Sequence, residues 1–206
     1  MAQSKKLGIT ILVIIVAAIG VYSFKSRLFS NSTSPTDAAT QRVKGNPNAP
    51  IKIIEYIDLQ CPACANGAVI LRDFVKRFPD KLYIQLKYFP LVTVHTHAIR
   101  SAVFADCAGL QGKFWPFFDL LMDRQSVWSK LTVADPEFLK IAQEVGLNEA
   151  ALQTCVADKK TAETVYKDKE GANGFGIQST PTYFINGKMI VGTKLLQEEL
   201  NKLLAI

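Results

Sequence analysis

The sequence predicts an α/β fold in which a strand–helix–strand unit, a helical insertion and a closing strand–strand–helix unit follow one another. Three observations support this order. Apolar, β-branched segments at residues 51–57 and 82–89 flank a segment with helical periodicity, residues 62–78. A long stretch with a helical pattern follows. Sheet-forming residues return only at 182–191, where an Asn-Gly pair between apolar runs is typical of a hairpin turn.

The first unit has clear boundaries. Its first strand, Ile51–Ile57, begins after a breaker segment rich in Gly, Asn and Pro at 45–50. The helix over 62–78 ends where Pro79 follows, and the second strand, 82–89, alternates polar and apolar residues. A strand, a helix and a strand in succession form a right-handed crossover, so we expect two parallel neighbouring strands.

The helical insertion is expected over about residues 95–176. Its helices are predicted at 97–110, from 115 onward, at 136–145 and after Asn148. The sheet then resumes with strands at 182–185 and 189–191, and a helix over 194–205 closes the chain.

The positive charge of the chain is concentrated near its N-terminus. The formal net charge is +6, but six of the 24 basic residues and only one of the 18 acidic residues lie in residues 1–44. The rest of the chain is nearly neutral and shows no basic patch of the kind that binds nucleic acid. We therefore predict no nucleic-acid partner.

Residues 7–24 form an uncharged, strongly apolar run that basic residues flank on both sides. A helix of this length spans about 27 Å, which is enough for a bilayer core. We therefore interpret residues 1–25 as an uncleaved signal-anchor with a single membrane span; a cleaved signal peptide is the alternative. Residues 26–49 are rich in Ser, Thr, Asn, Ala and Pro and are predicted to be a flexible linker to a domain at 50–206.

The segment Cys61-Pro62-Ala63-Cys64 lies where the first strand leads into the first helix. A helix N-terminus stabilises the thiolate of a cysteine placed there, and proline is favoured at the first helical position. A second sulfur one turn further on makes the pair a dithiol–disulfide exchange centre. Because disulfides persist outside the cytoplasm, the domain is expected to lie on the extracytoplasmic side of the cell membrane.

Two other interpretations of the paired cysteines remain open. A Cys-x-x-Cys pair is also half of a zinc site, but no second closely spaced pair exists, and His95 and His97 lie in a separate segment. A redox-silent structural disulfide is the other alternative. We predict redox chemistry and no metal site.

Three further residues are candidates from the pattern alone. Glu55 alternates with apolar residues on one strand face, so its carboxylate is expected to be buried with a raised pKa and to accept the proton of Cys64. A partly solvated or salt-bridged carboxylate is the alternative. Cys107 and Cys155 are either free buried thiols or, in an oxidising compartment, a structural disulfide.

Several motifs resemble one known family in the expected order. They are Cys61–Cys64, Tyr88–Leu91, the run from Ala105 to Trp115, and Ser179–Gly187. Over about residues 45–206 the chain resembles the DsbA-type thiol:disulfide oxidoreductases, and most of all their membrane-anchored BdbD-like members. The resemblance implies a thioredoxin-like fold with an inserted helical subdomain.

The resemblance also assigns roles to residues. It implies that Cys61 is the nucleophile and Cys64 the resolving thiol, and that an acidic residue at the offset of Glu55 serves them. Pro181 is expected to be a cis-proline that faces the disulfide, with Thr180 and Thr182 beside it contacting substrate. Many family members carry histidine where this chain has Ala63, which predicts a milder oxidant.

The function that the resemblance implies is disulfide formation in unfolded or exported cysteine-containing proteins. A quinone-linked membrane partner of the DsbB or VKOR type would reoxidise the enzyme, which needs no cofactor beyond the Cys61–Cys64 disulfide. One alternative is a reductase or isomerase kept reduced by a membrane electron carrier, because the direction depends on the reduction potential. A thioredoxin-like module that only binds peptides is the other.

Overall fold

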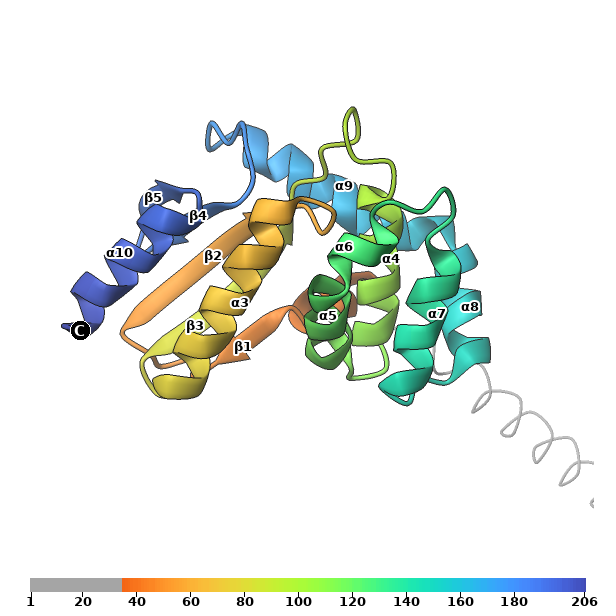
Figure 1. Cartoon of the computed structure of the whole chain (residues 1–206), viewed down its shortest axis with the longest axis horizontal. Helices are drawn as coiled ribbons and strands as arrows, with labels where there is room; N and C mark the ends of the chain where they lie inside the picture. The colour runs from red at the N-terminus through yellow and green to blue at the C-terminus, as the bar shows by residue number, and fades with distance from the viewer. Residues whose placement is uncertain (1–34) are drawn as a thin grey trace, which may run out of the picture. The chain divides into compact units, whose positions relative to one another are not determined.

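The computed structural model describes residues 35–206. The five strands of this part of the chain form one mixed sheet (Figure 1). Its strand order is β1-β3-β2-β4-β5. The strands are β1 (Val43–Gly45), β2 (Ile51–Ile57), β3 (Leu82–Tyr88), β4 (Thr182–Ile185) and β5 (Lys188–Val191). The β2–β3 pair is parallel, as the sequence predicts, and the other three pairs are antiparallel.

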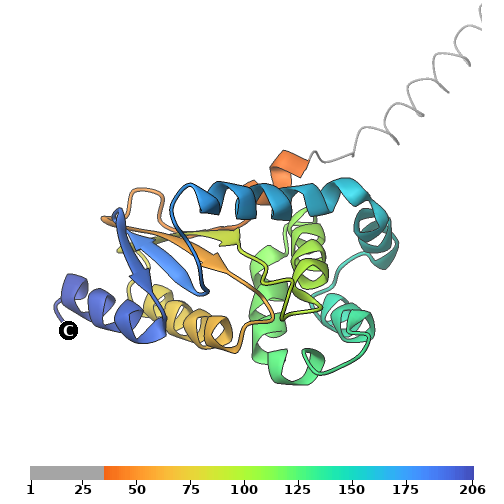
Figure 2. The same ribbon diagram turned by 90° about the horizontal axis from the view of Figure 1, so that it is seen from above.

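Helices cover both faces of this sheet (Figure 2). On one face lie α3 (Pro62–Arg77) and α10 (Thr193–Leu204), which share a core with alternate residues of the strands, Ile53 and Tyr183 among them. The opposite face packs against α9 (Lys159–Asn173), where Tyr56 contributes to a smaller cluster. Alternation along β2 therefore sends neighbouring side chains into two different cores.

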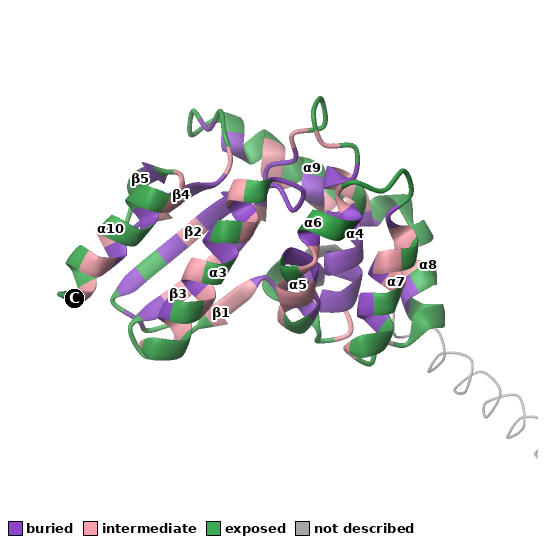
Figure 3. Cartoon of the chain, viewed as in Figure 1, coloured by how far each residue is buried: buried purple, intermediate pink, exposed green. Residues whose placement is uncertain are grey.

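The helical insertion lies between β3 and β4, which confirms the predicted fold class. Its helices before α9 are α4 (Ala98–Gly109), α5 (Phe114–Asp123), α6 (Gln125–Trp128), α7 (Asp135–Glu144) and α8 (Glu149–Ala157). Helix α4 is buried along most of its length and forms the centre of the subdomain (Figure 3). The single helix predicted after Asn148 is two helices, because Asp158 ends α8 and its carboxylate accepts the N–H of Lys160 at the start of α9.

The prediction of a flexible linker over residues 26–49 is wrong for residues 35–49. Residues 35–49 include the helix α2 (Pro35–Thr40) and the edge strand β1. The reason is Arg42, which is 1% exposed and donates from Nε and Nη2 to both carboxylate oxygens of Asp106, each at 2.8 Å. Arg42 also pairs with Asp168 and lies 4.3 Å from the ring centroid of Tyr88. These contacts join the segment to the folded domain.

The predicted membrane segment, residues 7–24, lies outside the described residues, as does the linker up to residue 34. Of the helices within 35–206, none has both the length and the apolar character that a membrane span requires.

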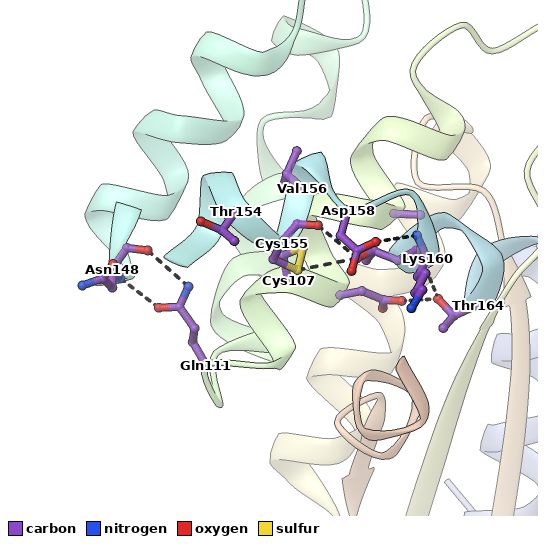
Figure 4. Close-up of a disulfide and its surroundings, with 12 residues drawn as sticks. Cys107, Gln111, Asn148, Thr154, Cys155, Val156, Asp158, Lys160 and Thr164 are labelled. Carbon is purple, nitrogen blue, oxygen red and sulfur yellow. Dashed lines mark hydrogen bonds between the residues drawn. A yellow bond between two sulfur atoms is a disulfide. The ribbon is translucent and has the colours of Figure 1, made fainter. Parts of the chain in front are cut away.

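A disulfide joins Cys107 of α4 to Cys155 of α8, with 5.8 Å between their Cα atoms (Figure 4). Beside it, the Gln111 side chain accepts a hydrogen bond from the Asn148 N–H at 2.8 Å and donates one to its carbonyl oxygen at 3.3 Å. The disulfide closes a loop with a sequence separation of 48, so it restricts the unfolded chain considerably.

Removing this disulfide should destabilise the fold. In a Cys61→Ala/Cys64→Ala background, which leaves one cysteine pair, Cys107→Ser/Cys155→Ser should lower the free energy of unfolding by about 2–4 kcal/mol, because the unfolded chain regains its freedom. Urea unfolding measures the difference. Equal unfolding midpoints would contradict the stabilising role.

Candidate active site

The paired cysteines lie at the start of α3. Cys61 is the N-cap residue, with extended φ and ψ of −75° and 123°, and Pro62 occupies the first turn. Both thiols are free. A reactive thiol at a helix start is expected to be exposed, but only 8% of the Cys61 surface is accessible, against 1% for Cys64. The reason is the loop around Thr180, whose carbonyl oxygen accepts a hydrogen bond from the Cys61 thiol at 3.6 Å.

The surroundings of Cys61 favour its thiolate. Its pKa falls to about 5, mainly because the Cys64 thiol donates a hydrogen bond to it. Burial opposes this effect, while the Thr180 side chain and the backbone N–H groups of Cys64 and Ala63 add to it. The helix N-terminus named by the sequence pattern thus contributes, but the neighbouring thiol contributes more.

Cys64 has the opposite character. Burial raises its pKa well above that of a free thiol, and its hydrogen bond to Cys61 and the charge there raise it further. At neutral pH the reduced site therefore holds a thiolate at Cys61 and a thiol at Cys64. This asymmetry defines Cys61 as the reactive sulfur, since the thiolate is the nucleophile.

The Thr180–Pro181 peptide bond is cis, and this loop faces Cys61. Apart from its contribution to the Cys61 thiolate, the buried Thr180 hydroxyl has no hydrogen-bond partner among residues 35–206. Thr182 does not have the position expected of a substrate contact. It is 1% exposed, and its hydroxyl donates to the Ser179 carbonyl oxygen at 2.7 Å. Because Thr182 begins β4, its backbone already pairs with β2 and β5.

Glu55 lies on β2 and is 2% exposed. Burial raises its pKa to about 8; the charge of Lys44 opposes this shift, and that of Asp119 adds to it. The carboxyl lines a small cavity together with these two residues, which form an ion pair of their own at 3.4 Å. Glu55 itself makes no ion pair within the described residues, so the salt-bridged alternative is not observed there. Its pKa suits a group that exchanges protons near neutral pH.

Two buried side chains that the sequence analysis missed hold the loop before Cys61. The Asp58 carboxylate accepts the N–H groups of Gln60 at 2.8 Å and Leu91 at 2.7 Å, and contacts His95 Nδ1 at 2.8 Å. From the helical subdomain, Gln125 Nε2 donates to the carbonyl oxygens of Leu59 at 2.7 Å and Cys61 at 2.9 Å. An Asp directly after a strand and before the cysteines was the only available signal.

Three solved structures have the same fold. The α-DsbA1 of Wolbachia pipientis is 25% identical with a TM-score of 0.68, and the match covers 79% of this chain and 89% of that one. Oxidised BdbD of Bacillus subtilis is 22% identical with a TM-score of 0.67, covering 81% and 94%. MdbA of Corynebacterium diphtheriae, a thiol-disulfide oxidoreductase, is 21% identical with a TM-score of 0.65, covering 81% and 91%.

This fold and its asymmetric cysteine pair define an enzyme of the protein-disulfide oxidoreductase class. A family model described as thioredoxin matches residues 37–205, and the chain belongs to the thioredoxin family.

The Na⁺/H⁺ antiporter NhaA 1 of Salinispora arenicola is 32% identical over 154 residues, which cover 75% of this chain and 23% of the antiporter. The chain thus spans less than a quarter of that relative's length.

The low pKa of Cys61 should depend on the donor at residue 64. Cys64→Ala removes the hydrogen bond, so the pKa of Cys61 should rise from about 5 to about 6–7. Cys64→Ser keeps a donor and is the matched control, with a smaller rise. The ultraviolet absorbance of the thiolate, followed against pH, gives both values. A Cys61 pKa that stays near 5 in Cys64→Ala would show that the donor at residue 64 does not set it.

Glu55→Gln should stabilise the protein at high pH and not at low pH. The pKa of the Glu55 carboxyl is about 8 in the folded protein and 4.5 in the unfolded chain. Wild type therefore loses stability as the pH rises from 4.5 to 8, because the unfolded chain ionises first, and above pH 8 the folded protein carries a buried charge. The advantage of the variant should grow from pH 5 to pH 8, reach a few kcal/mol, and then level off. Denaturant unfolding in a Cys61→Ala/Cys64→Ala background measures it. A pH-independent difference would place Glu55 in a solvated setting.

Proposed function

We propose that this enzyme is an oxidase, which transfers its Cys61–Cys64 disulfide to exported proteins that contain free cysteines. The observation that carries the proposal is the lowered pKa of Cys61. A stabilised thiolate favours the reduced form of the enzyme, and this makes the disulfide form a stronger oxidant. The similar structure of MdbA, a thiol-disulfide oxidoreductase, supports disulfide exchange at this site.

The proposed reaction has two exchange steps. A substrate thiolate attacks the Cys61 sulfur, the Cys61–Cys64 bond breaks, and Cys64 leaves with the electron pair and takes a proton from the protonated Glu55. Glu55 accepts that proton back when Cys64 is deprotonated for reoxidation. A second substrate thiolate then attacks the substrate sulfur of the mixed disulfide, and Cys61 leaves as a thiolate. The substrate is oxidised by two electrons, and the Cys61–Cys64 disulfide is reduced to the dithiol. Cys61 is a good leaving group because its pKa is about 5.

The compartment and the partner belong to the same proposal. The apolar run at residues 7–24 supports a single-pass membrane anchor, and the dithiol chemistry supports an extracytoplasmic domain. After each turnover the Cys61–Cys64 dithiol has to lose two electrons. We assign their removal to a quinone-linked membrane protein, because an anchored enzyme remains close to such a partner.

Ala63 limits the strength of the proposed oxidant. It provides no side-chain donor or charge at the start of α3, so the Cys61 thiolate depends on Cys64, Thr180 and backbone N–H groups. A histidine at this position would add a further stabilising group. We therefore expect a potential below that of the strongest oxidants with this fold.

The redox equilibrium of the full-length protein with glutathione tests the proposal. The midpoint potential should be less negative than about −200 mV and more negative than the roughly −120 mV of DsbA, because the thiolate is stabilised without a residue-63 side chain. The protein should also oxidise a reduced dithiol peptide. A potential near the roughly −270 mV of thioredoxin would instead support the reductase alternative.

A further inference from the structure

A buried tyrosine hydroxyl near the two cysteines has no role in the reaction described above. Tyr183 lies on β4 directly opposite Glu55 of β2, so both side chains point to the same face of the sheet, toward α3. Its residue is 0% exposed, and its hydroxyl has no hydrogen-bond partner among residues 35–206. A buried hydroxyl without a partner is disfavoured in a folded protein, so its presence needs an explanation.

Helix α3 leaves room for this hydroxyl. Gly67 lies inside the helix and is buried, and a methyl group added there would overlap the Tyr183 hydroxyl oxygen. Glycine is a poor helix former compared with alanine. The chain thus combines two locally unfavourable choices, a glycine within a helix and an unpartnered phenol, at one point of contact.

The hydroxyl lies near Cys64. Gly67 is three residues after Cys64, and side chains at this spacing lie on the same face of a helix with about 5–6 Å between their Cβ atoms. Because the hydroxyl occupies the place of a residue-67 side chain, it lies beside the face of α3 that carries Cys64. In agreement, burial and the charges on Glu55, Cys64 and Cys61 all raise the pKa of Tyr183.

We propose that Tyr183 is a positioning residue for disulfide exchange, whose hydroxyl completes a hydrogen-bonded path between the Glu55 carboxyl and the Cys64 sulfur. The inference rests on the proposed function. When substrate attack breaks the Cys61–Cys64 bond, Cys64 leaves with the electron pair. Through a bridging water on either side, the hydroxyl donates a proton toward the Cys64 sulfur and receives one that comes from Glu55. Glu55 becomes a carboxylate, Cys64 a thiol, and Tyr183 is unchanged.

Other charged and titratable groups face this path and stay in place when Tyr183 is changed. They are Cys61 at the N-cap of α3, Arg72 of α3, Lys44 of β1 and Asp119 of α5. The Asp58 backbone N–H also donates a hydrogen bond to Cys64 and lowers its pKa. Any change caused by removing one oxygen atom can therefore be assigned to the hydroxyl.

The test compares wild type with Tyr183→Phe, and uses Tyr56→Phe as the control. Tyr56 is a buried tyrosine on β2, but it belongs to the cluster on the opposite face of the sheet. Tyr183→Phe should slow the single-turnover reduction of the enzyme disulfide by a cysteine peptide about tenfold, the effect of losing one hydrogen bond to a charged group. Tyr56→Phe should leave the rate unchanged.

A second measurement does not depend on exchange activity. In Cys61→Ser protein, the pH dependence of Cys64 alkylation gives the pKa of Cys64 directly. Adding Tyr183→Phe should raise that pKa by about one, a tenfold loss of thiolate. The stability of Tyr183→Phe should equal or exceed that of wild type, because the change removes a hydroxyl without a protein partner.

Gly67→Ala tests the contact between helix α3 and the Tyr183 hydroxyl. Alone it should displace the hydroxyl and destabilise the protein, whereas in Tyr183→Phe it should be tolerated, since alanine favours the helix and the oxygen is gone. An unchanged exchange rate and an unchanged Cys64 pKa in Tyr183→Phe would overturn the inference, even if wild type is an active oxidase. A wild-type protein that fails to oxidise the peptide would instead overturn the proposed function, and with it the catalytic role of Tyr183.

Discussion

The site depends first on the position of the loop that joins β2 to α3. Its backbone is buried, so its polar groups need partners inside the protein. Asp58 provides them from within the loop, and Gln125 provides them from the helical subdomain. Because Gln125 binds the Cys61 carbonyl oxygen, the insertion holds the N-cap residue of α3 directly. The first N–H groups of the helix then point to the Cys61 sulfur, and the two parts of the fold meet at the reactive residue.

From this placement follows the distribution of charge. Cys61 receives hydrogen bonds from a thiol, a threonine and two backbone N–H groups, whereas Cys64 and Glu55 lie deeper and are shifted mainly by burial. A thiolate at Cys61 is therefore stable near neutral pH, while Cys64 and Glu55 are protonated there. The reduced site carries one negative charge, at the Cys61 sulfur. Deeper in the protein, the protonated Glu55 can supply a proton when the Cys64 sulfur becomes the leaving group.

The parts of this arrangement that the sequence predicts are those set by local patterns. Strand β2 follows from apolar periodicity, the nucleophile from the Cys-x-x-Cys motif at a helix start, and the buried Glu55 from strand alternation. The same alternation predicts that Thr182 and Tyr183 point to opposite faces, so the inward direction of Tyr183 could have been found. The folded segment before β2 could not, because the burial of Arg42 depends on Asp106, 64 residues away. The partners of Gln125 are non-local in the same way.

In this protein, a buried polar group with a structural role has several hydrogen-bond partners, whereas one with a chemical role has few. Asp106 is fully buried, and Arg42, Tyr88 and Thr164 all donate hydrogen bonds to its carboxylate. Burial raises its pKa, but the neighbouring guanidinium and these bonds oppose that shift, as expected of a group that joins elements together. Glu55 makes no ion pair within the described residues, and the Tyr183 hydroxyl has no hydrogen-bond partner there, although both are buried to a similar degree. Groups left in this state can bind and release protons as the neighbouring sulfur changes charge, which a saturated network cannot do.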